Sequence, residues 1–275
     1  MKEQQERKDS MLVYMRGAGD IATGIATRLH RCGLDVVMTD LAIPTSIRRT
    51  ICFSEAILNG EMTVEGVTAR LAKDAKWAKA IVNGGDIAVM ADPLCESRTA
   101  LQPDVVVDAI LAKRNIGTRM DDAPVVIGVG PGFTAGVDCH AVVETMRGHT
   151  LGRVYCQGSA MPNTGVPGDI GGFTLERILR APCDGVFKGV HQIGDTVEKG
   201  EICAYVDGQP IQSAIRGVLR GLLPDGLTVT AGMKSGDVDP RCEVSHCYMV
   251  SDKALSVGGG VLEAILALTH VLEKR

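Results

Sequence analysis

The first forty residues contain the sequence feature that most restricts the fold: an apolar run, a glycine turn, a helical stretch and a second apolar run. The first run covers residues 12–16 and the second covers residues 35–40. Between them, Gly17, Gly19 and Ala22 have the spacing G-x-G-x-x-G/A of a turn that links a strand to a helix. We therefore expect a strand–helix–strand unit of a parallel sheet.

The same turn predicts an anion site. A helix that starts at Asp20 would present free N–H groups and a positive dipole end to a phosphate. Asp40 lies 21 residues after Gly19, at the end of the second apolar run, where an acid can accept hydrogen bonds from a ribose diol. The turn and Asp40 together predict nucleotide binding. The alternative is that the glycines make only a strand-to-helix turn.

Further apolar runs at residues 87–91, 105–107 and 125–127 also read as strands buried on both faces, as in a parallel sheet. Residues 63–80 could supply a crossover helix. Ligands of parallel sheets bind beyond the carboxyl ends of the strands, although an Asp at a strand end can also make a turn or cap a helix. The expected cofactor-binding residues are Gly17, Gly19, Asp20, Ala22, Asp40, Asp92, Asp108, Gly130 and Gly132.

Asp138, Cys139 and His140 are the candidate catalytic residues, and they open a stretch of helical periodicity that ends at Met146. Asp138 fits a helix N-cap. A thiol near a helix start has a lowered pKa and is more reactive. A buried, inert thiol and a structural histidine are the alternatives.

Composition excludes several classes of protein. A net charge of −4 without a block of Lys or Arg argues against nucleic-acid binding, and no apolar run is long enough to span a membrane. Nine cysteines without a C-x-x-C motif fit free thiols in a reducing compartment, so we expect a cytoplasmic protein. Cys242, His246 and Cys247 form a ligand-like cluster, but no second Cys/His pair lies near it, and we expect no metal site.

An internal repeat marks a second module. Residues 185–200 and 217–232 share seven identities, with glycines at the expected turns. The two halves resemble the barrel-sandwich fold of biotinyl and lipoyl carrier domains. The connecting hairpin at residues 206–210 has no lysine to modify, so we expect neither biotin nor lipoate. A C-terminal helix over residues 261–274 follows a glycine run that we interpret as a hinge.

The expected fold class is therefore α/β: a Rossmann-like parallel sheet domain, a small all-β barrel-sandwich module and a C-terminal helix. The expected divisions are a disordered tail (1–10), a nucleotide-binding domain (11–150), a Gly/Pro-rich linker or lid (151–180), the repeat module (181–240) and a C-terminal strand and helix (241–275).

Several ordered strings carry a family resemblance; they lie at residues 16–24, 44–50, 53–56, 130–138, 144–149, 163–165 and 176–182. On these strings the chain resembles the YqeB-type accessory proteins of the selenium-dependent molybdenum hydroxylase system. Its first module is more distantly similar to XdhC-type xanthine dehydrogenase maturation factors. The resemblance implies a maturation role, with a molybdenum hydroxylase as client and a nucleotide-type small molecule as ligand. It carries over no catalytic residue.

Three functions follow as hypotheses. The first is a maturation factor that binds a dinucleotide such as NAD(P), or the nucleotide part of the molybdenum cofactor. The second is an NAD(P)-dependent oxidoreductase, although no Tyr-x-x-x-Lys pair is present. The third is a noncatalytic scaffold that docks a hydroxylase. A homo-oligomer is left open, as is the question of whether any reaction is catalysed.

Overall fold

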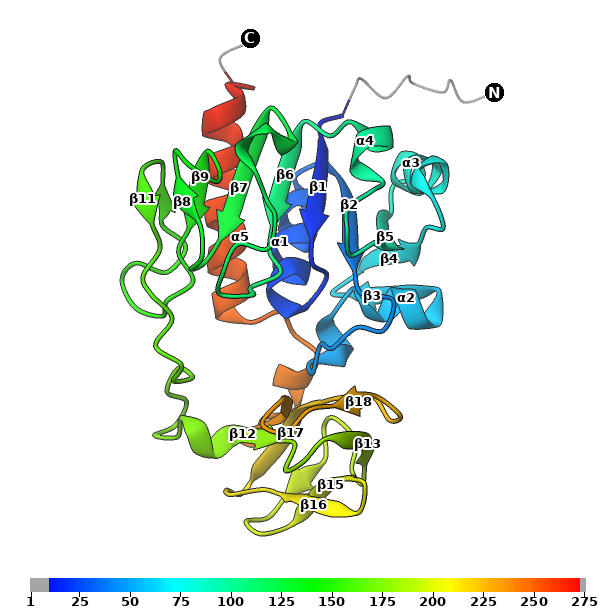
Figure 1. The fold of residues 1–275 in the computed structure, drawn as a ribbon, viewed down its shortest axis with the longest axis vertical. Helices are drawn as coiled ribbons and strands as arrows, with labels where there is room; N and C mark the ends of the chain where they lie inside the picture. Colours follow the sequence, from blue (N-terminus) through cyan, green and yellow to red (C-terminus); the bar gives the residue numbers. More distant parts are fainter. Residues whose placement is uncertain (1–9, 273–275) are drawn as a thin grey trace.

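A computed structural model describes residues 10–272, and its main layer is a nine-stranded sheet (Figure 1). Apart from Ser10, the expected tail lies outside the described residues. The strand order is β10-β9-β7-β6-β1-β2-β5-β4-β3. The strands are β1 (Leu12–Arg16), β2 (Asp35–Asp40), β3 (Glu61–Val64), β4 (Val67–Leu71), β5 (Ile87–Ala91), β6 (Val105–Asp108), β7 (Val125–Val129), β9 (Ala141–Val143) and β10 (Val154–Tyr155). Two short strands beside this sheet, β8 (Thr134–Ala135) and β11 (Gly158–Ser159), pair with each other.

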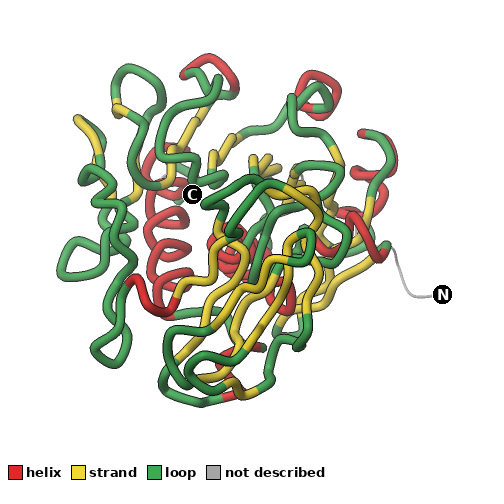
Figure 2. Tube along the Cα trace, turned by 60° about the horizontal axis from the view of Figure 1, so that its bottom comes forward, coloured by secondary structure: helices red, strands yellow, loops and turns green. Residues whose placement is uncertain are grey.

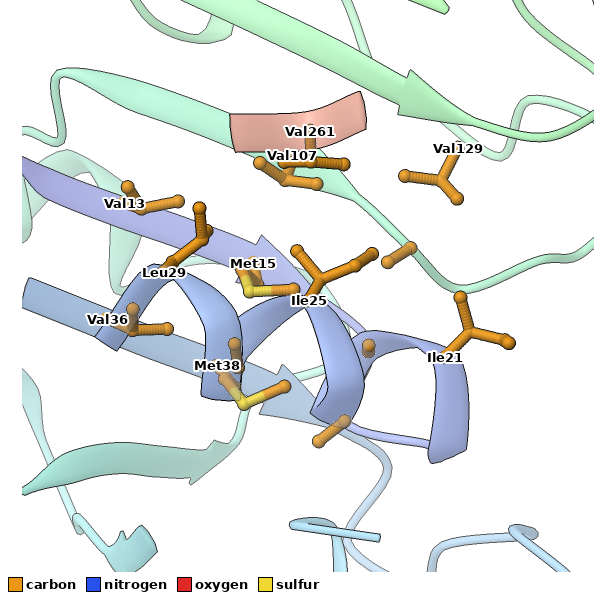
Figure 3. Close-up of a cluster of buried hydrophobic side chains, with 14 of the residues drawn as sticks. Val13, Met15, Ile21, Ile25, Leu29, Val36, Met38, Val107, Val129 and Val261 are labelled. Atoms are coloured by element: carbon orange, nitrogen blue, oxygen red, sulfur yellow. The ribbon is translucent and has the colours of Figure 1, made fainter. Parts of the chain in front are cut away.

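Both faces of the sheet are buried, which explains the continuous apolar runs. On one face, Met15 of β1 packs with helix α1, and Tyr14 of the same strand joins the core on the other face. Figure 3 shows the first core, where Ile25 and Leu29 of α1 lie over β1 and β2, close to Val261 of helix α5. The helices are α1 (Asp20–Arg31), α2 (Glu55–Asn59), α3 (Ala75–Asn83), α4 (Arg98–Leu101) and α5 (Asp252–Thr269), with 3-10 turns at Arg49–Ile51, Met120–Asp122, Leu175–Arg177 and Val244–Cys247.

Two four-stranded antiparallel sheets lie below the nine-stranded sheet in Figure 1 and come forward in Figure 2. Their strands are β12 (Ile178–Arg180), β13 (Gly185–Gly189), β14 (Thr196–Val197), β15 (Ile202–Val206), β16 (Gln209–Gln212), β17 (Gly217–Leu222), β18 (Thr228–Val229) and β19 (Lys234–Asp239). The halves of the internal repeat interlock, because β13 pairs with β18 and β14 pairs with β17. Each half therefore completes a sheet of the other.

The expected fold class is wrong, because the structure does not show the Rossmann-like parallel sheet that the sequence predicted. The large sheet is mixed: β3 and β4 are antiparallel, and so are β9 and β10. The connection from β6 to β7 contains a 3-10 turn instead of a crossover helix, and the connection from β7 to β9 runs through β8. The face beside α1 is covered by α5, which comes from the end of the chain and contacts α1 extensively.

Three local expectations are also corrected. Residues 63–80 form the β3–β4 hairpin and then α3, because Glu65 and Gly66 both have positive φ and make a tight hairpin turn. The stretch from Asp138 to Met146 contains strand β9, not a helix. Gly258–Gly260 lies within α5 instead of forming a hinge.

The glycines of α5 allow it to lie against its neighbours at short range. A Cβ atom on Gly260 would lie 2.1 Å from the carbonyl oxygen of Gly152, and one on Gly24 of α1 would lie 2.6 Å from the Cβ of Ala254. No side chain fits at such distances, since packed interiors leave few voids. The close contact between α1 and α5 therefore depends on Gly24, and the contact of α5 with the chain at Gly152 depends on Gly260.

Adjacent glycines of α5 give a matched pair of variants. Gly260→Ala should lower the free energy of unfolding by about 1–3 kcal/mol, because it overpacks the contact with Gly152. Gly259→Ala should raise it by about 0.5–1 kcal/mol, because its Cβ would meet only the Arg28 side chain at 3.7 Å and alanine favours a helix. Urea unfolding measures both. Equal effects of the two variants would contradict the packing described here.

Burial predicts which cysteines react. Cys139 is fully buried beside β9, and burial raises the pKa of its thiol to about 11. Iodoacetamide in mildly alkaline buffer should therefore modify the exposed Cys32, Cys156 and Cys242 and spare Cys139. Peptide mapping by mass spectrometry gives the readout. Modification of Cys139 in the folded protein at the rate of Cys156 would show that the thiol is accessible.

Candidate functional site

A cavity of about 660 Å³ lies where the large sheet meets the antiparallel sheets. One side is formed by the carboxyl ends of β1 and β2 and the turn that follows β1. The other side includes residues of the 3-10 turn at Leu175–Arg177, of β19 and of the first turn of α5. A volume of this size suits a small-molecule ligand.

Residues 44–50 connect the two sides of the cavity. The carbonyl oxygen of Ile47 accepts a hydrogen bond from the N–H of Leu222 (2.7 Å), and Nε of Arg49 donates to the carbonyl oxygen of Leu222 (2.9 Å). Gly221 allows this approach, because a Cβ there would lie 3.2 Å from the oxygen of Ile47. The segment therefore fixes strand β17 against the carboxyl ends of the large sheet.

Arg48 is the ion-pair bridge across the cavity. Its guanidinium donates to Asp20 at the start of α1 (2.9 Å) and to Asp237 of β19 (2.7 Å). The Asp237 side chain is 0% exposed. Burial alone would raise the pKa of Asp237, but Arg48 and then Lys234 outweigh it and lower the pKa to about 2.

Arg177 lies beside this bridge with part of its hydrogen-bonding capacity unused. Its side chain is 4% exposed, and Nη1 lies 3.8 Å from Asp237. Nη2 donates to the carbonyl oxygen of Gly168 (3.3 Å). Within residues 10–272, Nε and Nη1 find no hydrogen-bond partner. A buried cationic group with free N–H donors is costly unless an acceptor binds to it.

The cavity is lined by more cationic than anionic side chains. Arg16 and Arg147 are already paired, with Asp108 and Asp252, which lie outside the lining. That leaves four cations facing three carboxylates, and burial raises the pKa of one of these, Asp40. The four cations are Arg48, Arg177, Lys234 and Lys253, and the carboxylates are those of Asp20, Asp40 and Asp237.

The predicted glycine turn lies at the cavity, but the chain's own carboxylates bind its amides. Gly17, Gly19, Asp20, Ala22 and Asp40 all belong to the lining. Asp40 accepts hydrogen bonds from the N–H groups of Ala18 and Leu41 (both 2.8 Å), and Asp20 accepts one from Ile21 (2.8 Å). A Cβ on Gly19 would lie 3.2 Å from Oγ of Ser46. Ser46 thus occupies the side on which a pyrophosphate was expected.

The other predicted cofactor-binding residues lie outside the lining. Asp108 is buried and accepts hydrogen bonds from Arg16 (3.0 Å) and Thr118 (2.5 Å). Asp92 accepts from the N–H groups of the turn that precedes α4. Gly130 and Gly132 give room to neighbouring chain, since a Cβ would lie 2.8 Å from Thr145 and 2.6 Å from the backbone of Arg114, respectively.

The three candidate catalytic residues also have partners within the fold. Asp138 accepts from the N–H of Thr134 (2.8 Å) and from Asn115 (3.2 Å). Nδ1 of His140 accepts from the N–H of Val126 (2.9 Å). Cys139 is buried with a raised thiol pKa, opposite to the expected activation.

Sequence reasoning missed the residues that face the glycine turn across the cavity. Arg177 comes from the 3-10 turn before the second module, Lys234 and Asp237 come from that module, and Lys253 comes from α5. All four lie more than 150 residues from the glycine turn along the chain. Isolated Lys and Arg residues give no periodic signal. The one sequence signal that points to this side of the cavity is the adjacent pair Arg48 and Arg49, because both side chains bind residues of the second module.

The described residues contain neither a candidate metal site nor a membrane-spanning helix. No group of three or more His, Cys, Asp and Glu side chains between residues 10 and 272 is placed to hold a metal ion. In the same part of the chain, no helix has the length and apolar character needed to cross a membrane.

Comparison with solved structures returns proteins of the aspartoacylase type, with low scores. An aspartoacylase family protein from Mesorhizobium loti is 10% identical, with 84% of this chain and 85% of that chain covered and a TM-score of 0.27. A succinylglutamate desuccinylase/aspartoacylase from Rhodobacter sphaeroides is 15% identical, with 83% and 85% covered and a TM-score of 0.25. Scores this low transfer no function to this chain.

The functional expectations from the sequence are corrected here. The maturation role and the NAD(P)-dependent oxidoreductase find no support among the structures returned, which are aspartoacylase-type proteins. The glycine turn agrees with this correction, because its amides already bind Asp20 and Asp40.

Comparison of sequences gives a close match to a curated protein. The chain matches no protein-family model. It is 52% identical over 259 residues to the uncharacterized protein YqeB of Escherichia coli (strain K12), a match that covers 94% of this chain and 48% of that protein. The chain thus spans about half the length of the curated relative that it matches. The match supports the likeness to YqeB that was seen in the sequence. The name of that relative assigns it no role.

Proposed function

We propose that the cavity between the large sheet and the antiparallel sheets binds a small organic anion, a carboxylate or a phosphate compound. The observation that carries this proposal is Arg177, whose buried guanidinium has two nitrogen atoms without a hydrogen-bond partner among the described residues. An anionic oxygen would complete those hydrogen bonds. Charge-assisted bonds from a guanidinium to a carboxylate or phosphate are the strong ones.

The surrounding charges support an anion over a neutral ligand. Arg177, Lys234 and Arg48 all interact with the carboxylate of Asp237, so one negative charge is shared among three cations. Asp20 supplies a second negative charge, bound to Arg48. The remaining positive charge can be balanced by the ligand.

The lining also has an apolar part. Leu41, Ile110 and Ile116 are partly exposed there, next to Pro93. A ligand with a carbon skeleton would bury these surfaces, whereas a bare inorganic ion would leave them in water. The lining therefore suits an organic anion.

Thermal unfolding with added anions tests this proposal. Sodium phosphate, succinate, pyruvate and 2-oxoglutarate are compared with sodium chloride at equal ionic strength. A ligand present at about one hundred times its Kd stabilises the folded state by about 2.7 kcal/mol, which is a shift of several degrees in Tm for a protein of this size. We expect at least one organic anion to give such a shift.

Arg177→Met should abolish the shift, because it removes the free donors. The matched control is Arg216→Met, an arginine of the repeat module that is exposed and outside the lining; this variant should respond like the unmodified protein. The proposal fails if none of the anions raises Tm above the sodium chloride reference, or if Arg177→Met responds as strongly as the control.

A further inference from the structure

Lys253 is a lysine of the cavity without a partner. It lies in the first turn of α5, is half-buried and lines the cavity together with Ser251. Its ammonium makes neither a hydrogen bond nor an ion pair with another residue in the range 10–272, whereas Lys234 has an ion pair with Asp237. A half-buried charged amine without a partner has a reduced preference for its charged form.

The groups around Lys253 are mainly cationic. Burial has the largest effect and lowers the pKa of its ammonium, and Lys113 lowers it further. Arg147 and Arg48 act in the same direction, and the carboxylate of Asp20 opposes them. The positive end of the α5 dipole also disfavours an ammonium in the first helical turn. A lysine beside other cations becomes a nucleophile because more of it is neutral.

We propose that Lys253 forms an imine with a ligand that carries both a carboxylate and a ketone, that is, a 2-oxo acid. This inference rests on the proposed function, since the same cations that bind the carboxylate would bring the ketone to the amine. It goes beyond anion binding by naming the ligand class and the covalent bond.

The step balances in atoms and charge. The lone pair of the neutral Nζ attacks the ketone carbon and forms a C–N bond, and the carbon–oxygen bond breaks. The oxygen leaves as water, with one hydrogen from Nζ and one proton from the solvent or an acid of the cavity. The product is a protonated imine, and nothing is oxidised or reduced.

Reductive trapping tests the proposal on the full chain. Pyruvate or 2-oxoglutarate is added with sodium cyanoborohydride, which reduces an imine to a stable secondary amine. Peptide mapping then locates the adduct. Because the cavity would hold the ketone beside Nζ, and a positioned amine reacts much faster than one that meets the ketone by diffusion, Lys253 should be labelled at least about tenfold faster than the exposed Lys199.

Matched variants and ligands separate the outcomes. Lys253→Arg keeps the charge and should remove the fast label, while Lys199→Arg should not change it. Lactate and 2-hydroxyglutarate, which have a hydroxyl in place of the ketone, should compete with trapping without forming an adduct. Labelling spread evenly over surface lysines, or undiminished in Lys253→Arg, overturns the inference.

The thermal shift separates failure of this inference from failure of the proposed function. If lactate or succinate raises Tm and Arg177→Met abolishes that effect, but no adduct forms at Lys253, the anion site stands and the imine is rejected. If no anion raises Tm and no adduct forms, both are rejected.

Discussion

The arrangement of this protein depends on one guanidinium, that of Arg48. It joins Asp20, at the first residue of α1, to Asp237, a fully buried carboxylate of the antiparallel sheets. Without Arg48, Asp237 would lose its nearest cation in a buried setting, where an unpaired charge is strongly destabilising. The hydrogen bonds of Ile47 and Arg49 with Leu222 join the same two parts of the fold. This short segment both holds the two parts together and forms one wall of the cavity.

The same arrangement explains why the glycine turn gives a misleading signal. Gly17 has a positive φ, and a Cβ there would lie 2.9 Å from the carbonyl oxygen of Ala109, so the tight turn is required by packing alone. Asp40 and Asp20 then accept hydrogen bonds from the N–H groups of Ala18 and Ile21, two of the amides that a diphosphate would need. The cationic groups that can hold an anion lie across the cavity instead, on the second module and on α5. A ligand would therefore be held mainly by side chains, not by the turn.

The central strands could be predicted from the sequence, because runs such as residues 105–107 and 125–127 are buried on both faces and carry a continuous apolar signal. The hairpin of β3 and β4 was missed, although the alternation of apolar Val67, Ala69 and Leu71 with polar residues is typical of a strand, and Glu65–Gly66 marks its turn. The place of α5 beside α1 depends on glycines that touch residues far away in the chain, which a local pattern does not reveal. For the candidate site, the turn and Asp40 were predicted to lie at the strand ends, and they do line the cavity. Arg177 and Lys253 enter it only through tertiary packing.

A double-mutant cycle on Arg48 and Asp237 tests the central claim most directly. Urea unfolding is measured for the unmodified protein, Arg48→Met, Asp237→Asn and the double variant. If the pair joins the two parts of the fold as described, the coupling energy should be about 2–3 kcal/mol, near the upper end of the range for contacting residues. A coupling within about 0.5 kcal/mol of zero, the range for independent sites, would show that the two residues act separately and would contradict the account.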